Sequence, residues 1–206
     1  MTPSSVLTRS AATEATTDDH QRPFRLAVLV ASTREGRFAP VIARWFAGHA
    51  ERYEHAEVDL VDLAELRPYE LRHGTPEFEE YAARIDAADA FVVITPEYNH
   101  SFPAPLKHAV DLLRAEWQAK PVGFVSYGGI SGGLRAVEQL RLVFAELHAT
   151  TVRETVSFPL ASALFDDEGR LLDAAAPDTA ARLLLDQLGW WATALRTARA
   201  AHPYGG

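Results

Sequence analysis

Short apolar runs alternate with longer amphipathic stretches from residue 24 onward. The residues at 24–31 (FRLAVLVA) and 90–95 (AFVVIT) are almost continuously apolar and too short for helices, which is typical of strands in a parallel sheet covered on both faces. Less continuous apolar runs recur at similar intervals along the chain. The pattern predicts five strands, at residues 24–31, 56–61, 90–95, 121–127 and 150–157.

Between these runs the apolar residues recur at helical spacing. Pro40 suits the first turn of one helix, and Thr75 followed by Pro76 marks the start of another. We predict five helices, near residues 40–49, 76–85, 104–115, 134–147 and 183–195. Strands that alternate with helices in this way predict a single three-layer α/β domain around a parallel sheet.

The ends of the chain differ from this pattern. Residues 1–22 are rich in Ser, Thr and Ala without a periodic apolar face, so we expect a disordered N-terminal tail. The domain is predicted to span residues 23–201, with 202–206 as a C-terminal tail. The tail lacks the apolar run of a signal peptide, and no segment approaches eighteen apolar residues. We therefore expect a cytoplasmic protein without a membrane partner.

Composition excludes several kinds of function. The chain has 206 residues, a formal net charge of −8 and no basic stripe, which argues against a nucleic-acid partner. It has no cysteine, which removes disulfides and thiolate metal sites. The histidines have no metal-ligand spacing with one another or with carboxylates, so we expect no metal site.

In parallel α/β sheets, ligands bind beyond the carboxyl ends of the strands. The loop after the first strand, STREGR at residues 32–37, leads into a helix start, where main-chain N–H groups, hydroxyls and arginines suit a phosphate monoester. An N-capping turn with two solvated arginines is the plainer alternative. The loop matches neither the GxGxxG fingerprint nor the P-loop, which requires a lysine.

Two more segments follow predicted strands. TPEYNHSFPAPL, residues 95–106, holds three prolines and the only asparagine of the chain. It is either a stiff ledge that suits a flat heteroaromatic ring or an ordinary proline-rich loop. SYGGISGG, residues 126–133, has four glycines within six residues, which allow close approach to a ligand or serve only to turn the chain.

The glycine-rich segment also satisfies GxSxG, the nucleophile motif of serine hydrolases, with Ser131 as the candidate nucleophile. That mechanism needs an acid and a histidine later in the chain. After His148 the only histidine is His202, four residues from the C-terminus, and too few strands follow Ser131 to complete the hydrolase fold. We regard the hydrolase as a remote alternative.

Together, STREGR, PEYNHSFPAPLKHAVD and SYGGISGG with the following AVEQLR resemble the NADPH-dependent FMN reductase family, which comprises flavodoxin-like NAD(P)H:flavin and quinone reductases. The middle segment is the most specific, and the resemblance covers residues 24–157. It implies a flavodoxin-like three-layer sandwich with a five-stranded parallel sheet in the order 2-1-3-4-5. Ala31 departs from the pattern, since many relatives have glycine there.

The resemblance implies which residues hold the cofactor. Ser32, Arg34 and Arg37 would bind the FMN phosphate with help from the main chain of Phe38 and Ala39. An edge of the isoalloxazine would lie against Pro96, Glu97, Tyr98 and Asn99. The pyrimidine end would meet Ser126, Tyr127, Gly128 and Gly129, with Gly132 close by. No catalytic side chain is obligatory, because the chemistry belongs to the flavin.

The implied function is that of an oxidoreductase that takes hydride from NADPH or NADH and reduces a small acceptor such as a flavin, quinone, azo compound or metal ion. The alternative is a flavodoxin-like single-electron carrier without NAD(P)H activity of its own. The resemblance also implies a homodimer or homotetramer, with contacts through the helices that follow Pro105 and Gly133.

Overall fold

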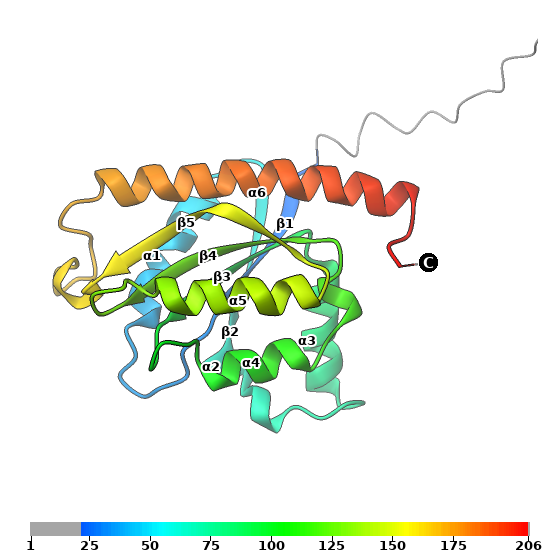
Figure 1. Cartoon of the computed structure of the whole chain (residues 1–206), viewed down its shortest axis with the longest axis horizontal. Coiled ribbons are helices and arrows are strands. Elements are labelled where there is room, and N and C mark those ends of the chain that lie inside the picture. Colours follow the sequence, from blue (N-terminus) through cyan, green and yellow to red (C-terminus); the bar gives the residue numbers. More distant parts are fainter. Residues whose placement is uncertain (1–21, 206) are drawn as a thin grey trace, which may run out of the picture.

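A computed structural model describes residues 22–205; the predicted tail at 1–22 lies outside the described residues except for Arg22, as does Gly206. The sheet has five strands, all parallel, in the order β2-β1-β3-β4-β5 (Figure 1). The strands are β1 (Phe24–Val30), β2 (Ala56–Asp62), β3 (Ala90–Pro96), β4 (Pro121–Gly128) and β5 (Thr150–Pro159). This topology confirms the predicted flavodoxin-like fold.

Helices cover both faces of the sheet. The core on one face includes residues of α1 (Ala39–Glu51) and α6 (Ala175–Ala201), and α6 runs along that face (Figure 1). The opposite core includes residues of α3 (Pro76–Ala87), α4 (Ala104–Asp111) and α5 (Leu134–Glu146). The shorter turns are α2 (Leu63–Leu66) and the 3₁₀ helices η1 (Pro68–Glu70), η2 (Ala115–Trp117) and η3 (Ala161–Ala163). Because both faces are covered, β3 and all but the last residue of β4 are buried.

Two predicted helices differ in extent. Helix α4 ends at Asp111 instead of near residue 115, because the chain turns there to bury Trp117, whose Nε1–H donates to the Val110 carbonyl over 3.1 Å. Helix α6 begins at Ala175, well before the predicted 183, in a stretch with few large apolar side chains. Alanine has the highest helix propensity, and Pro177 is tolerated in the first turn, so this stretch is helical without a strong apolar period.

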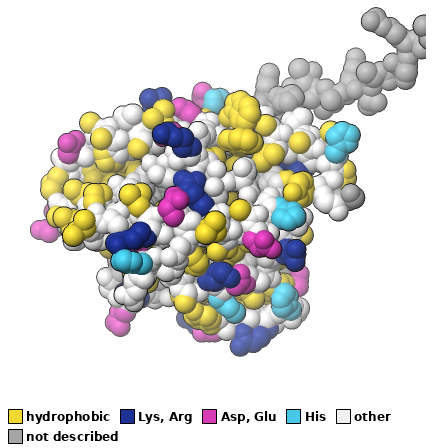
Figure 2. Space-filling view, in the orientation of Figure 1, with side chains coloured by type: hydrophobic (Ala, Val, Ile, Leu, Met, Phe, Trp, Pro, Cys, Tyr) yellow, Lys and Arg dark blue, Asp and Glu magenta, His cyan; other side chains and the backbone are white. Residues whose placement is uncertain are grey.

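The C-terminal residues that follow α6 contact the domain. The Tyr204 hydroxyl lies 3.2 Å from His148 Nδ1. Among the described residues, no helix combines the length and apolar character that crossing a bilayer requires. On the face shown in Figure 2, acidic and basic side chains are interspersed.

Candidate functional site

The loops after β1, β3 and β4 meet at the carboxyl edge of the sheet, because neighbouring parallel strands end on the same side. The Ser32 hydroxyl, after β1, lies 2.8 Å from the hydroxyl of Tyr98, after β3. The Glu97 N–H donates to the Tyr127 carbonyl over 3.0 Å, and the Ser131 hydroxyl donates to Glu97 over 2.8 Å. The structure thus brings together the three segments that the sequence singles out.

The first loop presents a series of main-chain hydrogen-bond donors at the start of α1. Among the residues that the structure describes, none accepts a hydrogen bond from the main-chain N–H groups of residues 32–38. Helix α1 has thirteen residues, no side-chain N-cap and no acidic residue in its first turn. Unpaired N–H groups and the positive end of a helix dipole suit an anion, so this loop fits the phosphate of FMN.

The side chains of this loop have different surroundings. Ser32 is completely buried and its hydroxyl faces Tyr98. Arg34 is exposed, and its guanidinium carbon lies 3.5 Å from the centroid of the Tyr98 ring, a cation–π contact. Arg37 points instead toward the end of β2, where it forms a two-bond ion pair with Asp62. Phe38 is partly buried, and Ala39 is buried.

Asp62 is a member of this site that local sequence patterns do not indicate. It is the last residue of β2, and its carboxylate both accepts from Arg37 and caps α2 through the Ala64 N–H. The only local signal was the Asp before LAEL, an ordinary N-cap pattern. Its contact with the first loop spans 25 positions of sequence, which no local pattern reveals.

The ledge after β3 is a tight hairpin. Tyr98 and Ser101 exchange main-chain hydrogen bonds of 2.8 and 3.0 Å around Asn99 and His100, whose φ values are 51° and 68°. Left-handed backbone at two successive non-glycine residues is strained and needs support from its surroundings. Gln139 of α5 supplies it, since its amide donates to the His100 carbonyl and accepts from the Ser101 hydroxyl. Pro96, before the hairpin, is buried.

Glu97 connects the ledge to the glycine-rich loop. Its side chain is only 6% exposed, and it accepts from the Ser131 hydroxyl and from the Arg135 N–H at 3.1 Å, while Arg135 Nε lies 2.6 Å away. Burial alone would raise the pKa of Glu97, but the bonds from Ser131 and Arg135 outweigh it and lower the pKa. Glu97 is therefore a carboxylate that fixes two loops relative to each other, and Arg135 is a partner that sequence reasoning missed.

The glycine-rich loop has an open part and a tightly packed part. Ser126 is buried and donates to the Gly132 carbonyl at 2.8 Å. Gly133 has a φ of +90°, and a Cβ there would lie 2.9 Å from the Tyr127 nitrogen. At Gly129, by contrast, a Cβ would meet nothing within 4 Å, and the residue is exposed. Gly128 is partly buried, and burial raises the pKa of Tyr127 above its ordinary value.

The arrangement does not support a nucleophilic Ser131. Its hydroxyl donates to the Glu97 carboxylate, and its Oγ accepts the Gly133 N–H at 3.3 Å. The serine–histidine mechanism that the GxSxG motif suggests needs an imidazole at that position to take the proton. Glu97 is instead held as a fixed anion by Arg135.

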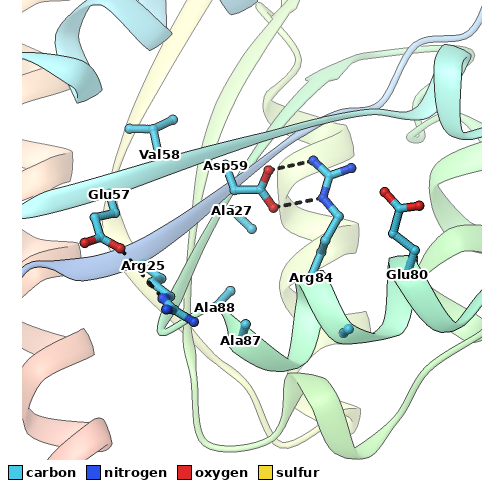
Figure 3. Close-up of a pocket in the computed structure, with 10 residues that line it drawn as sticks. Arg25, Ala27, Glu57, Val58, Asp59, Glu80, Arg84, Ala87 and Ala88 are labelled. Carbon is cyan, nitrogen blue, oxygen red and sulfur yellow. Dashed lines mark hydrogen bonds and ion pairs between the residues drawn. The ribbon is translucent and has the colours of Figure 1, made fainter.

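A cavity of about 410 Å³ lies away from this edge, between β1, β2 and α3 (Figure 3). Alanine side chains form its apolar part, and two ion pairs stand at its rim. The pairs join Arg25 to Glu57 and Arg84 to Asp59. Its lining residues include none from the loops after β1, β3 and β4.

The strand order, with three loops that meet at the carboxyl edge of the sheet, defines a flavodoxin-like α/β protein. The family model for NADPH-dependent FMN reductase matches residues 24–163. The chain belongs to this family, as the loop motifs predicted.

Individual relatives agree with this assignment. The chain is 34% identical over 124 residues to an NAD(P)H-dependent FMN reductase of Schizosaccharomyces pombe, an alignment that covers 53% of this chain and 60% of that protein. It is 33% identical over 174 residues to a probable NADPH:quinone oxidoreductase of Oryza sativa, an alignment that covers 78% of this chain and 88% of that protein. The solved flavoenzyme NAD(P)H:(acceptor) oxidoreductase FerB of Paracoccus denitrificans superposes with a TM-score of 0.60 at 23% identity, covering 82% of this chain and 97% of that one, and so shares the fold.

Proposed function

We propose that the protein is an FMN-dependent NAD(P)H oxidoreductase that reduces a small acceptor such as a flavin, quinone, azo compound or metal ion. The observation that carries the proposal is the loop at the start of α1, whose main-chain N–H groups have no acceptor among the described residues. It lies at the same sheet edge as the PEYN ledge and the glycine-rich loop. Family membership and the relatives named as FMN and quinone reductases support it.

The proposed cofactor site consists of the residues that the sequence suggested. The N–H groups of residues 32–38 and the exposed Arg34 would hold the phosphate, and the Ala39 main chain begins the helix behind it. The ledge would support one edge of the ring, and the exposed Gly129 would lie near its pyrimidine end. The residues proposed to line or support the FMN site are Ser32, Arg34, Arg37, Phe38, Ala39, Pro96, Glu97, Tyr98, Asn99, Ser126, Tyr127, Gly128, Gly129 and Gly132.

FMN bound there would supply the redox chemistry by accepting hydride from NADPH or NADH and passing electrons to the acceptor. The chain's own part is position and electrostatics. Among the described residues, none accepts from the main-chain N–H groups of residues 129–131, which could stabilise negative charge on a ring beside them. Glu97, through Ser131 and the Arg135 N–H, keeps this loop in place.

The test is a visible absorption spectrum of the purified protein, repeated without oxygen after NADPH or NADH is added. We expect flavin absorbance that bleaches with the reduced nucleotide. Flavin that fails to bleach would favour the single-electron carrier. A protein that contains no flavin and binds none on reconstitution would overturn the proposal.

We also propose a homodimer or homotetramer in the cytoplasm. Leu134 and Leu142 on α5 are 50% and 75% exposed, and Tyr69, which packs its ring 4.9 Å from His108 of α4, is 52% exposed. Large apolar side chains on neighbouring helices suit a subunit contact. A monomer in light scattering would contradict this part of the proposal.

A further inference from the structure

We propose that Asp62 is a positioning residue for the phosphate of FMN, acting through Arg37, which it holds behind the first loop. The inference rests on the proposed function of that loop. It assigns Arg37 a supporting role in place of the direct phosphate contact that the sequence suggested, and it adds Asp62, which lies on another strand.

The geometry of Arg37 carries the argument. Nη1 and Nη2 donate to the two carboxylate oxygens of Asp62 over 2.5 and 2.7 Å. Nη1 also donates to the Ser32 carbonyl over 2.7 Å. Three of the five guanidinium donors are thus directed at Asp62 and at the loop's own main chain. The Arg37 side chain therefore ties the last residue of the loop back to its first.

This tie matters because the loop has little other support. Among the described residues, the other side-chain contacts of this loop come from Ser32, whose hydroxyl bonds to Tyr98 and also interacts with Tyr127, and from Arg34, which stacks on Tyr98. No described residue accepts a hydrogen bond from the main-chain N–H groups of this loop. Donors fixed in advance bind an anion more tightly than donors that must be ordered at the time of binding. By linking the two ends of the loop, Arg37 keeps these N–H donors in place before the anion binds.

Asp62 is itself firmly held. It ends β2 opposite Val30 of β1, and its Oδ1 accepts the Ala64 N–H over 3.0 Å at the start of α2. The side chains of Arg37 and Asp62 are only 17% and 15% exposed, so solvent screens the pair weakly. The hydrogen bond to Asp62 raises the pKa of Arg37, consistent with a strong pair.

The same strand provides a matched control. Asp59 accepts two bonds from Arg84 of α3, over 2.9 and 2.6 Å, at the rim of the cavity in Figure 3. Here too the aspartate hydrogen bond raises the pKa of the arginine. This pair has the same chemistry and lies three residues earlier in the chain. It is more exposed, at 32% and 45%, and within the described part of the chain its hydrogen bonds go to β2 and not to the loop. If losing an ion pair on β2 weakened FMN binding only by destabilising the fold, removal of Asp59 should weaken it too, in proportion to the stability that each variant loses in thermal unfolding.

The experiment compares Asp62→Asn with Asp59→Asn. Asparagine serves as well as aspartate in an N-cap, so α2 keeps its start while the charge on Arg37 loses its partner. Dissociation constants of apoprotein for FMN and for riboflavin, which lacks the phosphate, are measured by fluorescence quenching, and thermal unfolding is followed without flavin. We expect Asp62→Asn to raise the dissociation constant for FMN about tenfold, or about 1.4 kcal/mol. The dissociation constant for riboflavin should change less than about twofold. Asp59→Asn should leave both constants within about twofold.

A double variant tests whether Asp62 acts on FMN binding through Arg37. In an Arg37→Gln background, Asp62→Asn should add less than about twofold to the loss of FMN affinity, because Asp62 acts through Arg37. If Asp62→Asn does not fold, Asp62→Ser, which also caps helices, takes its place.

An unchanged ratio of FMN to riboflavin affinity in Asp62→Asn would overturn the inference, as would tighter FMN binding, which would mean that the carboxylate only repels the phosphate. If the wild-type protein binds FMN normally and the variant does too, the inference fails and the proposed function stands. If the wild type binds neither flavin, the proposed function fails, and the inference with it.

Discussion

Substitution of Gly129 by valine tests directly whether the glycine-rich loop contacts the flavin. In the structure a Cβ at this position meets no atom within 4 Å, and the residue is exposed. Folding should therefore tolerate valine, with a change in the free energy of unfolding within about 0.5 kcal/mol. If the flavin lies against Gly129, the branched side chain displaces it. We expect an FMN dissociation constant raised about 10- to 100-fold, equal to about 1.4–2.8 kcal/mol.

Gly133 provides the contrast. Its φ is +90°, and a Cβ would lie 2.7 Å from Ser126 Cβ and 2.9 Å from the Tyr127 nitrogen. Left-handed backbone costs a side chain about 1–2 kcal/mol, and overlap with a buried strand adds to this. Gly133→Ala should therefore lower the free energy of unfolding by at least about 2 kcal/mol even without flavin.

The assay is urea unfolding of both apoproteins beside FMN titration of each. Gly129→Val should affect binding and not stability, whereas Gly133→Ala should affect stability first. Unchanged FMN affinity in Gly129→Val would remove this loop from the cofactor site. Loss of stability in that variant would mean that the space beside Gly129 is filled in solution.

Three other predictions follow from the described contacts. Glu97→Gln should lower the free energy of unfolding at pH 7 by about 1–2 kcal/mol, a modest loss because Arg135 is half exposed. Because the pKa of Glu97 is lowered, the extra free energy of unfolding of the wild type over this variant should disappear as the pH falls from the ordinary carboxyl range through that pKa. If urea unfolding showed the same difference in strong acid, the pairing would be refuted. Burial lowers the pKa of Lys120 to about 8, so the unfolded lysine keeps its proton to higher pH than the folded one. The stability of wild type relative to Lys120→Met should therefore rise by up to about 3 kcal/mol between pH 8 and the ordinary lysine pKa, and a flat difference would count against this. Leu142→Glu should shift an oligomer toward monomer in light scattering without loss of helix content, and an unchanged mass would exclude Leu142 from the subunit contact.

The sequence by itself determined the elements and the loops that matter. Apolar runs and helical spacing are local properties, so they placed all five strands and the main helices to within a few residues, apart from the ends of α4 and α6. The PEYN and glycine-rich segments indicated the family because their residue types are contiguous. The parallel topology then required those loops to share one edge of the sheet.

Only the tertiary structure decided how the side chains at that edge are paired. Ser32 meets Tyr98 across 66 positions, Glu97 meets Ser131 across 34, and Arg37 meets Asp62 across 25. No local pattern contains such partners, because they depend on which strands become neighbours and on the pleat that points each side chain toward one loop. An arginine that the sequence suggests as a phosphate ligand is, in the folded protein, committed to a carboxylate at the end of another strand.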